Sequence, residues 1–111
     1  MAFLLHSELA ILDIRKIEDY CLNPDHPRGR HKARMFRELV GITRDDAEWL
    51  RGVLLNGVRT SEATKLADDI FGSRWRVDLP ISRQSKRAVV RTVWIVRTGE
   101  DRPRFVTCWV L

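Results

Sequence analysis

The sequence predicts an α+β fold in which N-terminal helices pack on one face of a C-terminal antiparallel β-meander of three to four strands. Apolar residues recur at helical spacing through the first half of the chain, whereas from Trp75 onward they alternate with polar residues, as in half-buried strands. The chain has 111 residues, which is enough for one hydrophobic core but too few for two. We therefore expect a single domain over residues 1–111.

The N-terminal segment, residues 1–14, contains a short apolar run from Ala10 to Ile14 that fits an edge strand. A helical part is expected over residues 15–72, beginning with a short helix in which Ile17 and Cys21 fall at helical spacing. The segment lacks the basic leader of a signal peptide, and the chain has no apolar run of about 18 residues. These features predict a cytoplasmic protein that does not enter a membrane.

A second helix is predicted to open at Gly29–Lys32, directly after the Pro- and Gly-rich turn N-P-D-H-P-R-G. Its helical spacing predicts four buried side chains, which are Met35, Phe36, Leu39 and Val40. Gly41 is placed to end the helix in the left-handed conformation. The basic side chains of this helix are then expected to stay outside the core.

The start of this second helix concentrates positive charge. Between Arg28 and Arg37 there are five Lys or Arg residues, one His and no acid. A helix N-terminus already carries partial positive charge, so each added cation costs a few tenths of a kcal/mol up to about 1 kcal/mol. A bound anion would offset this repulsion, which makes the segment a candidate phosphate-binding site.

A third helix is predicted to begin at Thr43, because Asp45 and Asp46 follow it as favourable first-turn residues. Its apolar stripe consists of Ala47, Leu50, Val53 and Leu54, with Trp49 beside it. The acidic stretch between Val58 and Gly72 predicts either another short helix or an ordered loop.

The antiparallel sheet is expected over residues 73–111. Alternation with a period of two predicts a strand around Trp75–Ile81, a long strand over Arg87–Thr98 and a third over Arg104–Leu111. Polar turns separate the three segments, so neighbouring strands in the sequence are expected to pair.

Arginines are expected to gather on one face of this sheet. Alternation along the long strand places Arg87, Arg91 and Arg97 on the same side. If Arg74 and Arg76 of the preceding strand join them, guanidinium groups stand between apolar side chains on one surface. Such a surface suits phosphates and bases.

The net charge of +5 is unevenly distributed along the chain. Residues 28–43 carry +4 and residues 74–111 carry +6, whereas residues 1–27 carry −3 and residues 44–73 carry −2. Two basic segments that share a face are typical of a protein that binds a polyanion. A solvated, arginine-rich surface is the alternative interpretation.

Metal and cofactor chemistry is not indicated by the sequence. The His and acidic residues lack metal-ligand spacing, and neither a Walker loop nor a G-x-G-x-x-G turn occurs. Cys21 and Cys108 lack C-x-x-C spacing and are expected to be buried, reduced packing residues. We therefore expect no metal and no cofactor.

Metal-independent cleavage of RNA remains compatible with the residue types present. It needs groups that take the 2′-hydroxyl proton and protonate the leaving oxygen, and cations that stabilise the transition state. Histidine titrates near neutral pH, so His31 suits either proton-transfer role, the alternative being a merely exposed residue. Lys32, Arg91 and Arg104 suit the cationic role, and Thr107 on the last strand is the fifth catalytic candidate. The candidates for contacts with the nucleic-acid backbone are Arg28, Arg30, Arg34, Arg74, Arg76, Arg87 and Arg97.

Three segments together, L-N-P-D-H-P-R-G-R-H-K-A-R-M-F, V-V-R-T-V-W-I-V-R and P-R-F-V-T-C-W-V, resemble a family of small bacterial proteins of formally unknown function. The segment W-R-V-D-L-P-I belongs to the same resemblance, which extends from about Lys16 to Val110. Similar domains occur as stand-alone proteins beside a small partner gene and as C-terminal tips of polymorphic toxins. The family resembles the Barnase/EndoU/Colicin/RelE (BECR) nuclease superfold.

This resemblance implies a toxin-like domain with a BECR-like fold and ribonuclease activity. The residues that match the family motifs and carry usable chemistry are His31, Lys32, Arg91, Arg104 and Thr107. The implied partners are RNA and a small acidic antitoxin or immunity protein. A catalytically inert RNA- or nucleotide-binding module and a protein-interaction module remain the two alternatives.

Overall fold

The computed structural model describes residues 2–111 and has the predicted α+β architecture. Its two longer helices are α2 (Arg30–Val40) and α3 (Ala47–Thr60). The short helical turns are η1 (Ser7–Leu9), α1 (Ile14–Lys16), the π-helical η2 (Ile17–Cys21) and η3 (Arg44–Asp46). The strands are β1 (Ala63–Asp69), β2 (Gly72–Arg83), β3 (Lys86–Arg97) and β4 (Arg104–Val110).

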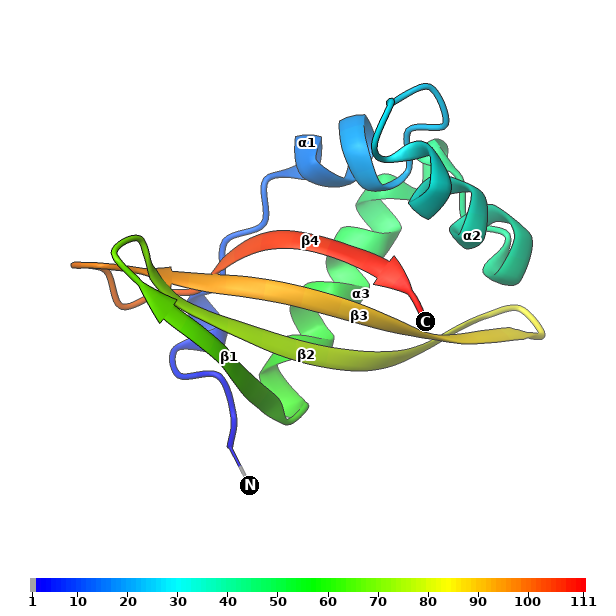
Figure 1. Cartoon of the computed structure of the whole chain (residues 1–111). Coiled ribbons are helices and arrows are strands. Elements are labelled where there is room, and N and C mark those ends of the chain that lie inside the picture. The colour runs from blue at the N-terminus through cyan, green and yellow to red at the C-terminus, as the bar shows by residue number, and fades with distance from the viewer. Residues whose placement is uncertain (1) are drawn as a thin grey trace.

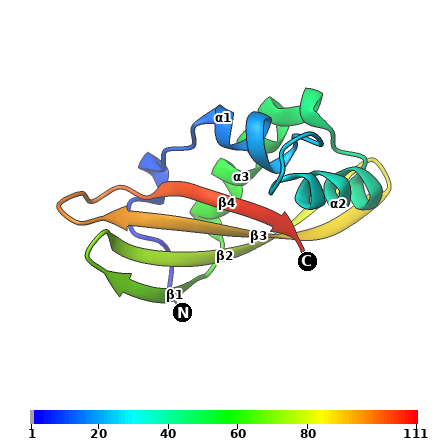
Figure 2. The same cartoon turned by 45° about the horizontal axis from the view of Figure 1, so that its top comes forward.

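The four strands form one antiparallel sheet in the order β1-β2-β3-β4, so each strand pairs with its neighbour in the sequence. All the labelled helices lie on one side of this sheet, as Figure 1 and Figure 2 show from two angles. α2 packs against β3 and β4, and α3 packs against β2. The opposite face of the sheet is left open by the helices of residues 2–111.

The hydrophobic core fills the space between the helices and the sheet. Its largest fully buried side chains are Trp94, Phe36 and Phe105. The Trp94 indole Nε1 donates a hydrogen bond to the buried Thr92 hydroxyl, at 2.8 Å, and that hydroxyl donates to the Val77 carbonyl, at 2.6 Å. Every polar group of this buried chain is therefore satisfied, which indicates a structural role for Thr92.

Two expectations about local structure are wrong, one in the helical part and one in the N-terminal segment. The segment between Val58 and Gly72, expected as a helix or loop, forms β1, because pairing with β2 satisfies its backbone and Asp69 closes the turn. The Asp69 carboxylate accepts hydrogen bonds from the Phe71 and Gly72 N–H groups, at 2.8 and 3.3 Å. The helical part thus ends at Thr60 and the sheet begins at Ala63.

The expected N-terminal edge strand also does not form. Ile11 makes only an isolated parallel bridge to Arg104, through hydrogen bonds to the neighbouring residues Pro103 and Phe105. The chain turns away at once because the Asp13 side chain accepts the Arg15 N–H, at 3.0 Å, and so starts α1. The edge of the sheet on this side is therefore β4.

Helix α2 ends as predicted, with Gly41 at φ 66° in the left-handed conformation. Its buried face is narrower than expected, because Phe36 and Val40 are buried whereas Met35 and Leu39 are 38% and 42% exposed. Both of these side chains therefore lie outside the hydrophobic core. In α3, Trp49 is likewise 37% exposed and packs against the Arg83 guanidinium, 5.0 Å from the ring centre.

The sheet register places the arginines as the alternation suggested. Arg74 lies opposite Ile95, and Arg76 lies opposite Val93, so both share the open face with Arg91. Their charge is partly neutralised on that face. Arg91 donates to both oxygens of Asp78, at 2.9 and 3.0 Å, and this guanidinium lowers the Asp78 pKa below its usual value.

The start of α2 depends on a close backbone approach. A Cβ atom on Gly29 would lie 2.1 Å from the Tyr20 carbonyl oxygen, so glycine lets α2 sit directly against η2. The same region is tied by His26, whose Nδ1 accepts the Arg28 and Gly29 N–H groups at 3.0 and 2.9 Å.

Gly29→Ala is expected to destabilise the protein by about 1–3 kcal/mol, because the added methyl group must displace backbone. Gly52→Ala is the matched control, since a Cβ there meets nothing within 4 Å and alanine favours the helix by about 0.5–1 kcal/mol. Urea unfolding of the two variants measures both effects. Equal stability of Gly29→Ala and the unchanged protein would contradict the close approach.

Asp78→Asn is expected to lower stability by at most about 1 kcal/mol at pH 7, since the Asp78–Arg91 pair is partly solvated. Because the folded pKa of Asp78 is lowered, its contribution is present above the unfolded pKa and is lost as pH falls through the folded pKa. The difference between the two proteins should therefore shrink below about pH 4.

Urea titrations between pH 7 and pH 3 check this dependence. Asp101→Asn is the control, because Asp101 is exposed and forms no ion pair within residues 2–111. If the difference in unfolding free energy between Asp78→Asn and the unchanged protein stays constant over this range, the ionised Asp78 carboxylate contributes nothing to stability in solution.

Candidate functional site

The candidate site is centred on Lys32 in the first turn of α2. Its Nζ donates to the Thr107 hydroxyl of β4, at 2.9 Å, and to the Tyr20 hydroxyl of η2, at 3.3 Å. The same ammonium lies over two aromatic rings, 4.7 Å from the Tyr20 centre and 5.3 Å from the Trp109 centre. Three elements that are distant in the sequence thus hold one cation.

All of the partners of Lys32 are neutral. Hydroxyl oxygens and aromatic faces orient an ammonium group without cancelling its charge, unlike a carboxylate. Lys32 forms no ion pair with any acid in residues 2–111. Its positive charge therefore remains available to an incoming anion.

A cavity of about 400 Å³ opens beside this lysine. Its lining consists of His31, Lys32, Met35, Trp109 and Val110. Met35 forms a wall of this cavity, which accounts for its 38% exposure. The site therefore joins a cation, an imidazole and an aromatic ring around one opening, a combination suited to a nucleotide.

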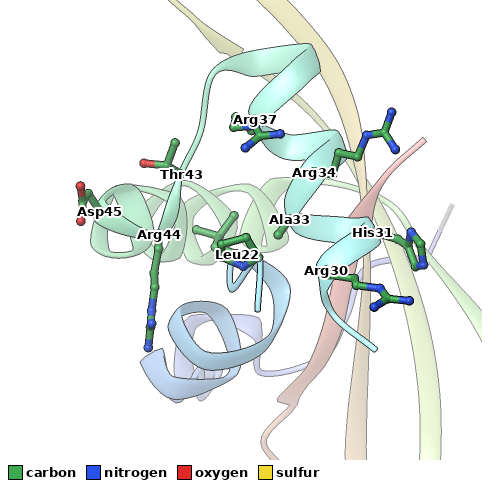
Figure 3. A pocket seen from close by; sticks show the side chains of 10 residues that line it. Leu22, Arg30, His31, Ala33, Arg34, Arg37, Thr43, Arg44 and Asp45 are labelled. Atoms are coloured by element: carbon green, nitrogen blue, oxygen red, sulfur yellow. The ribbon is translucent and has the colours of Figure 1, made fainter. Parts of the chain in front are cut away.

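His31 is exposed at the mouth of this cavity. It follows Gly29 and Arg30 at the start of α2, and Figure 3 shows its ring on the same side of the helix as Arg30 and Arg34. An exposed imidazole next to a fixed ammonium can exchange protons with a bound substrate and with water.

A buried cysteine lies behind the lysine. The Cys21 thiol of η2 is 3.8 Å from the Thr107 hydroxyl, and both cysteines are free and buried, as the sequence predicted. The Cys21 pKa is lowered to about 7, chiefly by the Cys108 thiol, with smaller contributions from Thr107 and Lys32. The Cys108 pKa is raised, because Cys21 and burial both disfavour a second thiolate.

The five predicted catalytic residues do not all meet. His31, Lys32 and Thr107 lie together, and Arg91 stands next to them because it is the cross-strand partner of Trp109. Arg104 is placed at the other end of β4, opposite Ile95, where it pairs with Glu100 at 3.1 Å. Two residues of strand lie between it and Thr107, so the two positions are about 10 Å apart.

The seven arginines predicted to contact nucleic acid fall into two groups. Three lie exposed around the start of α2, namely Arg28, Arg30 and Arg34. The others belong to β2 and β3, namely Arg74, Arg76, Arg87 and Arg97. In the second group Arg74 pairs with Asp69 and Arg76 lies 3.8 Å from Asp78, whereas Arg87 is exposed and forms no ion pair within residues 2–111.

Sequence reasoning missed Tyr20, His26 and Trp109 as parts of the site. His26 fixes the turn before α2, and its ring meets the Tyr20 ring edge-on at 4.7 Å. Trp109 is the cross-strand neighbour of Arg91, which places it beside the basic face. Period-two alternation on the last strand contained this signal, because it puts Thr107 and Trp109 on one side.

A second cavity, of about 530 Å³, lies between α2 and the segment that follows it. Figure 3 shows Leu22 and Ala33 between α2 and the segment Thr43–Asp45, with Arg37 on the same side of the helix as that segment. His31 lines both cavities. Within residues 2–111 no group of three or more His, Cys, Asp or Glu side chains is arranged to hold a metal ion.

None of the helices in residues 2–111 combines the length and the apolar character that a membrane span requires.

Comparison of the fold with solved structures finds one chain of a complex described as "Contact-dependent growth inhibition toxin - immunity protein complex from Klebsiella pneumoniae 342". The TM-score is 0.67 at 16% sequence identity, and the alignment covers 91% of this chain and 99% of that chain. At this identity the likeness establishes a shared fold alone.

A search of curated proteins finds no match to this chain. The family described as "Domain of unknown function (DUF6883)" matches residues 4–111. Because this match spans nearly the whole sequence, the chain belongs to the DUF6883 family.

Proposed function

We propose that this protein is a metal-independent ribonuclease toxin that a small acidic immunity or antitoxin protein neutralises. The observation that carries the proposal is the Lys32 ammonium, held 2.9 Å from Thr107 with no acidic partner in residues 2–111, at a cavity that it shares with His31 and Trp109. Cleavage of RNA without a metal requires these functions in one place: a cation, a proton-transfer group and a surface for a base.

In the proposed reaction the RNA 2′-oxygen attacks the adjacent phosphorus and the bond from phosphorus to the 5′-oxygen breaks. The 2′-hydroxyl loses its proton to a base, and the 5′-oxygen receives a proton from an acid, which leaves a 2′,3′-cyclic phosphate and a 5′-hydroxyl. His31 supplies one of these two proton transfers. Lys32 stabilises the negative charge on the phosphoryl oxygens, or donates the second proton, while Thr107 and Tyr20 fix its position.

The remaining basic residues supply affinity in this proposal. Arg91, next to Trp109, is close enough in the sheet to contact the same phosphate after releasing Asp78. Arg104 is assigned to the RNA backbone instead of the reacting phosphate, because Glu100 holds it at the far end of β4. The open sheet face with Arg74, Arg76 and Arg87 extends the path for the strand.

A toxin role and a protein partner are supported by the fold shared with one chain of a growth inhibition toxin–immunity complex. That complex contains a toxin and an immunity protein, and the charge of this chain favours the toxin role. A net charge of +5, with a basic cavity, fits a toxin that acts on RNA and attracts an acidic inhibitor. We extend the proposal to membership of the BECR superfold, on the basis of the motif resemblance.

The second candidate is a module that binds RNA without cleaving it. The sheet face favours this interpretation, since Arg87 is exposed there and forms no ion pair within residues 2–111, so it can bind a phosphate without taking part in cleavage. Cleavage and binding are therefore measured separately.

His31→Ala and Lys32→Ala are each expected to reduce the rate of RNA cleavage by at least about 100-fold, because each removes a proton-transfer or charge-stabilising group. The measurement is cleavage of total RNA by the purified proteins, together with growth after induced expression in a bacterial host. Arg102→Gln is the matched control, since it removes one exposed charge that lines neither cavity.

Unchanged cleavage in both variants would contradict the assigned site. If the unchanged protein binds RNA and leaves it intact, the binding module is correct instead. Salt-insensitive association with a protein, and none with RNA, would point to the protein-interaction alternative.

Arg87→Gln is expected to lower the salt dependence of RNA binding by about 0.7 in the slope of log affinity against log salt, the value for one phosphate contact on a single strand. Arg74→Gln should have a smaller effect, because Asp69 already neutralises that guanidinium. Titration of a 2′-O-methyl oligonucleotide at several salt concentrations measures both slopes without cleavage. Equal slopes for all three proteins would remove the sheet face from the interface.

A further inference from the structure

The cavity of about 530 Å³ beside α2 is not used by the proposed reaction. Its apolar lining consists of the exposed Pro24 and of Leu22 and Ala33, which are buried. Its cationic lining includes Arg37 from α2 and Arg44 from η3 (Figure 3). An exposed proline ring and guanidinium groups in one cavity offer partners to a base and to a phosphate.

Two of the arginines at this cavity form ion pairs. Arg34 pairs with Glu38 at 2.8 Å. Arg44 pairs with Asp19 at 2.8 Å, but both side chains are about half exposed, so the pair costs little to exchange. Arg37 forms no ion pair with any acidic side chain of residues 2–111, so its positive charge is available to a ligand.

The shape and chemistry favour a nucleotide over an isolated acidic side chain. A carboxylate would pair with a guanidinium group and leave the Pro24 ring exposed. A nucleotide satisfies both, because the face of its base packs on the proline ring while its phosphate binds an arginine, and arginine also stacks on base faces. The volume lies within the range of about 300–1,000 Å³ for small-molecule sites.

The position links this cavity to the proposed catalytic site. His31 lines both cavities, so a strand that crosses the start of α2 passes from one to the other. The cations exposed along this route are Arg30 and Arg34. The two cavities are thus neighbouring positions on one path.

We propose that the cavity bounded by Leu22, Ala33, Arg37 and Arg44 is a nucleotide subsite that holds a residue of the RNA strand flanking the cleaved phosphate. The inference rests on the proposed function for the identity of the strand. Its occupant is nevertheless a ribonucleotide in its own right, so its binding is measured apart from cleavage. Arg37 binds the phosphate, and the exposed Pro24 ring supports the base.

The test is titration of the whole protein with each of the four ribonucleoside 5′-monophosphates and with inorganic phosphate, followed by calorimetry and by backbone amide shifts in NMR. At least one nucleotide should bind more tightly than phosphate and shift the amides of residues 33–37 and 43–45. Arg37→Gln should weaken this binding about tenfold, the loss of one charged hydrogen bond. Arg59→Gln removes an exposed charge outside both cavities and should leave the affinity unchanged.

Leu22→Ala is not used, because Leu22 is buried and its loss would perturb the fold. Pro24→Ala tests the exposed apolar wall instead: it should weaken nucleotide binding and leave phosphate binding unchanged, and thermal unfolding confirms that the variant is folded. Nucleotide binding that persists when cleavage is absent supports the subsite and defeats the ribonuclease proposal alone.

Three results would overturn the subsite. The first is no detectable binding of any nucleotide at millimolar concentration. The second is binding that Lys32→Ala removes and Arg37→Gln leaves intact, which would place the nucleotide in the other cavity. The third is tighter binding of an oligoglutamate peptide than of every nucleotide, which would assign the cavity to an acidic protein.

Discussion

The arrangement of the site depends on one constraint: the Lys32 ammonium group has no acidic counter-ion within residues 2–111. Lys32 is half-buried between η2, α2 and β4, where its partners are two hydroxyls and two aromatic rings. An isolated charge at such a position costs free energy unless polar groups surround it. Tyr20 and Thr107 meet this cost with neutral atoms, and the glycine at position 29 brings η2 close enough to do so. The result is a fixed charge that the protein itself does not neutralise.

The fold class and the strands β2, β3 and β4 were predictable because the sheet is a meander. Each strand pairs with its neighbour in sequence, so period-two alternation and polar turns contain the whole topology. The strand β1 was not predictable by these means, since all of its residues after Ala63 are exposed and no alternation remains. Its identity comes from pairing with β2, which local sequence does not reveal.

The site was predictable only in part, for a related reason. His31 and Lys32 stood out because cations at a helix start oppose the helix dipole. Arg91 was found from alternation, but its capture by Asp78 depended on the register of β2 and β3. Tyr20 gave no local signal of a role, and alternation placed Trp109 beside Thr107 without showing that η2 and β4 meet at Lys32.

The hydrogen bond between Lys32 and Thr107 joins residues 75 positions apart, whereas the sheet assembles from neighbours in the sequence. Closing a long loop carries an entropic cost that local pairing does not. The meander can therefore form before α2 docks, and the contacts of Lys32 with β4 form late. A chain caught partway through folding, or opened locally at α2, retains most of its secondary structure and lacks its functional charge. Under the proposed toxin function, this order of assembly delays the harmful activity until the fold is complete.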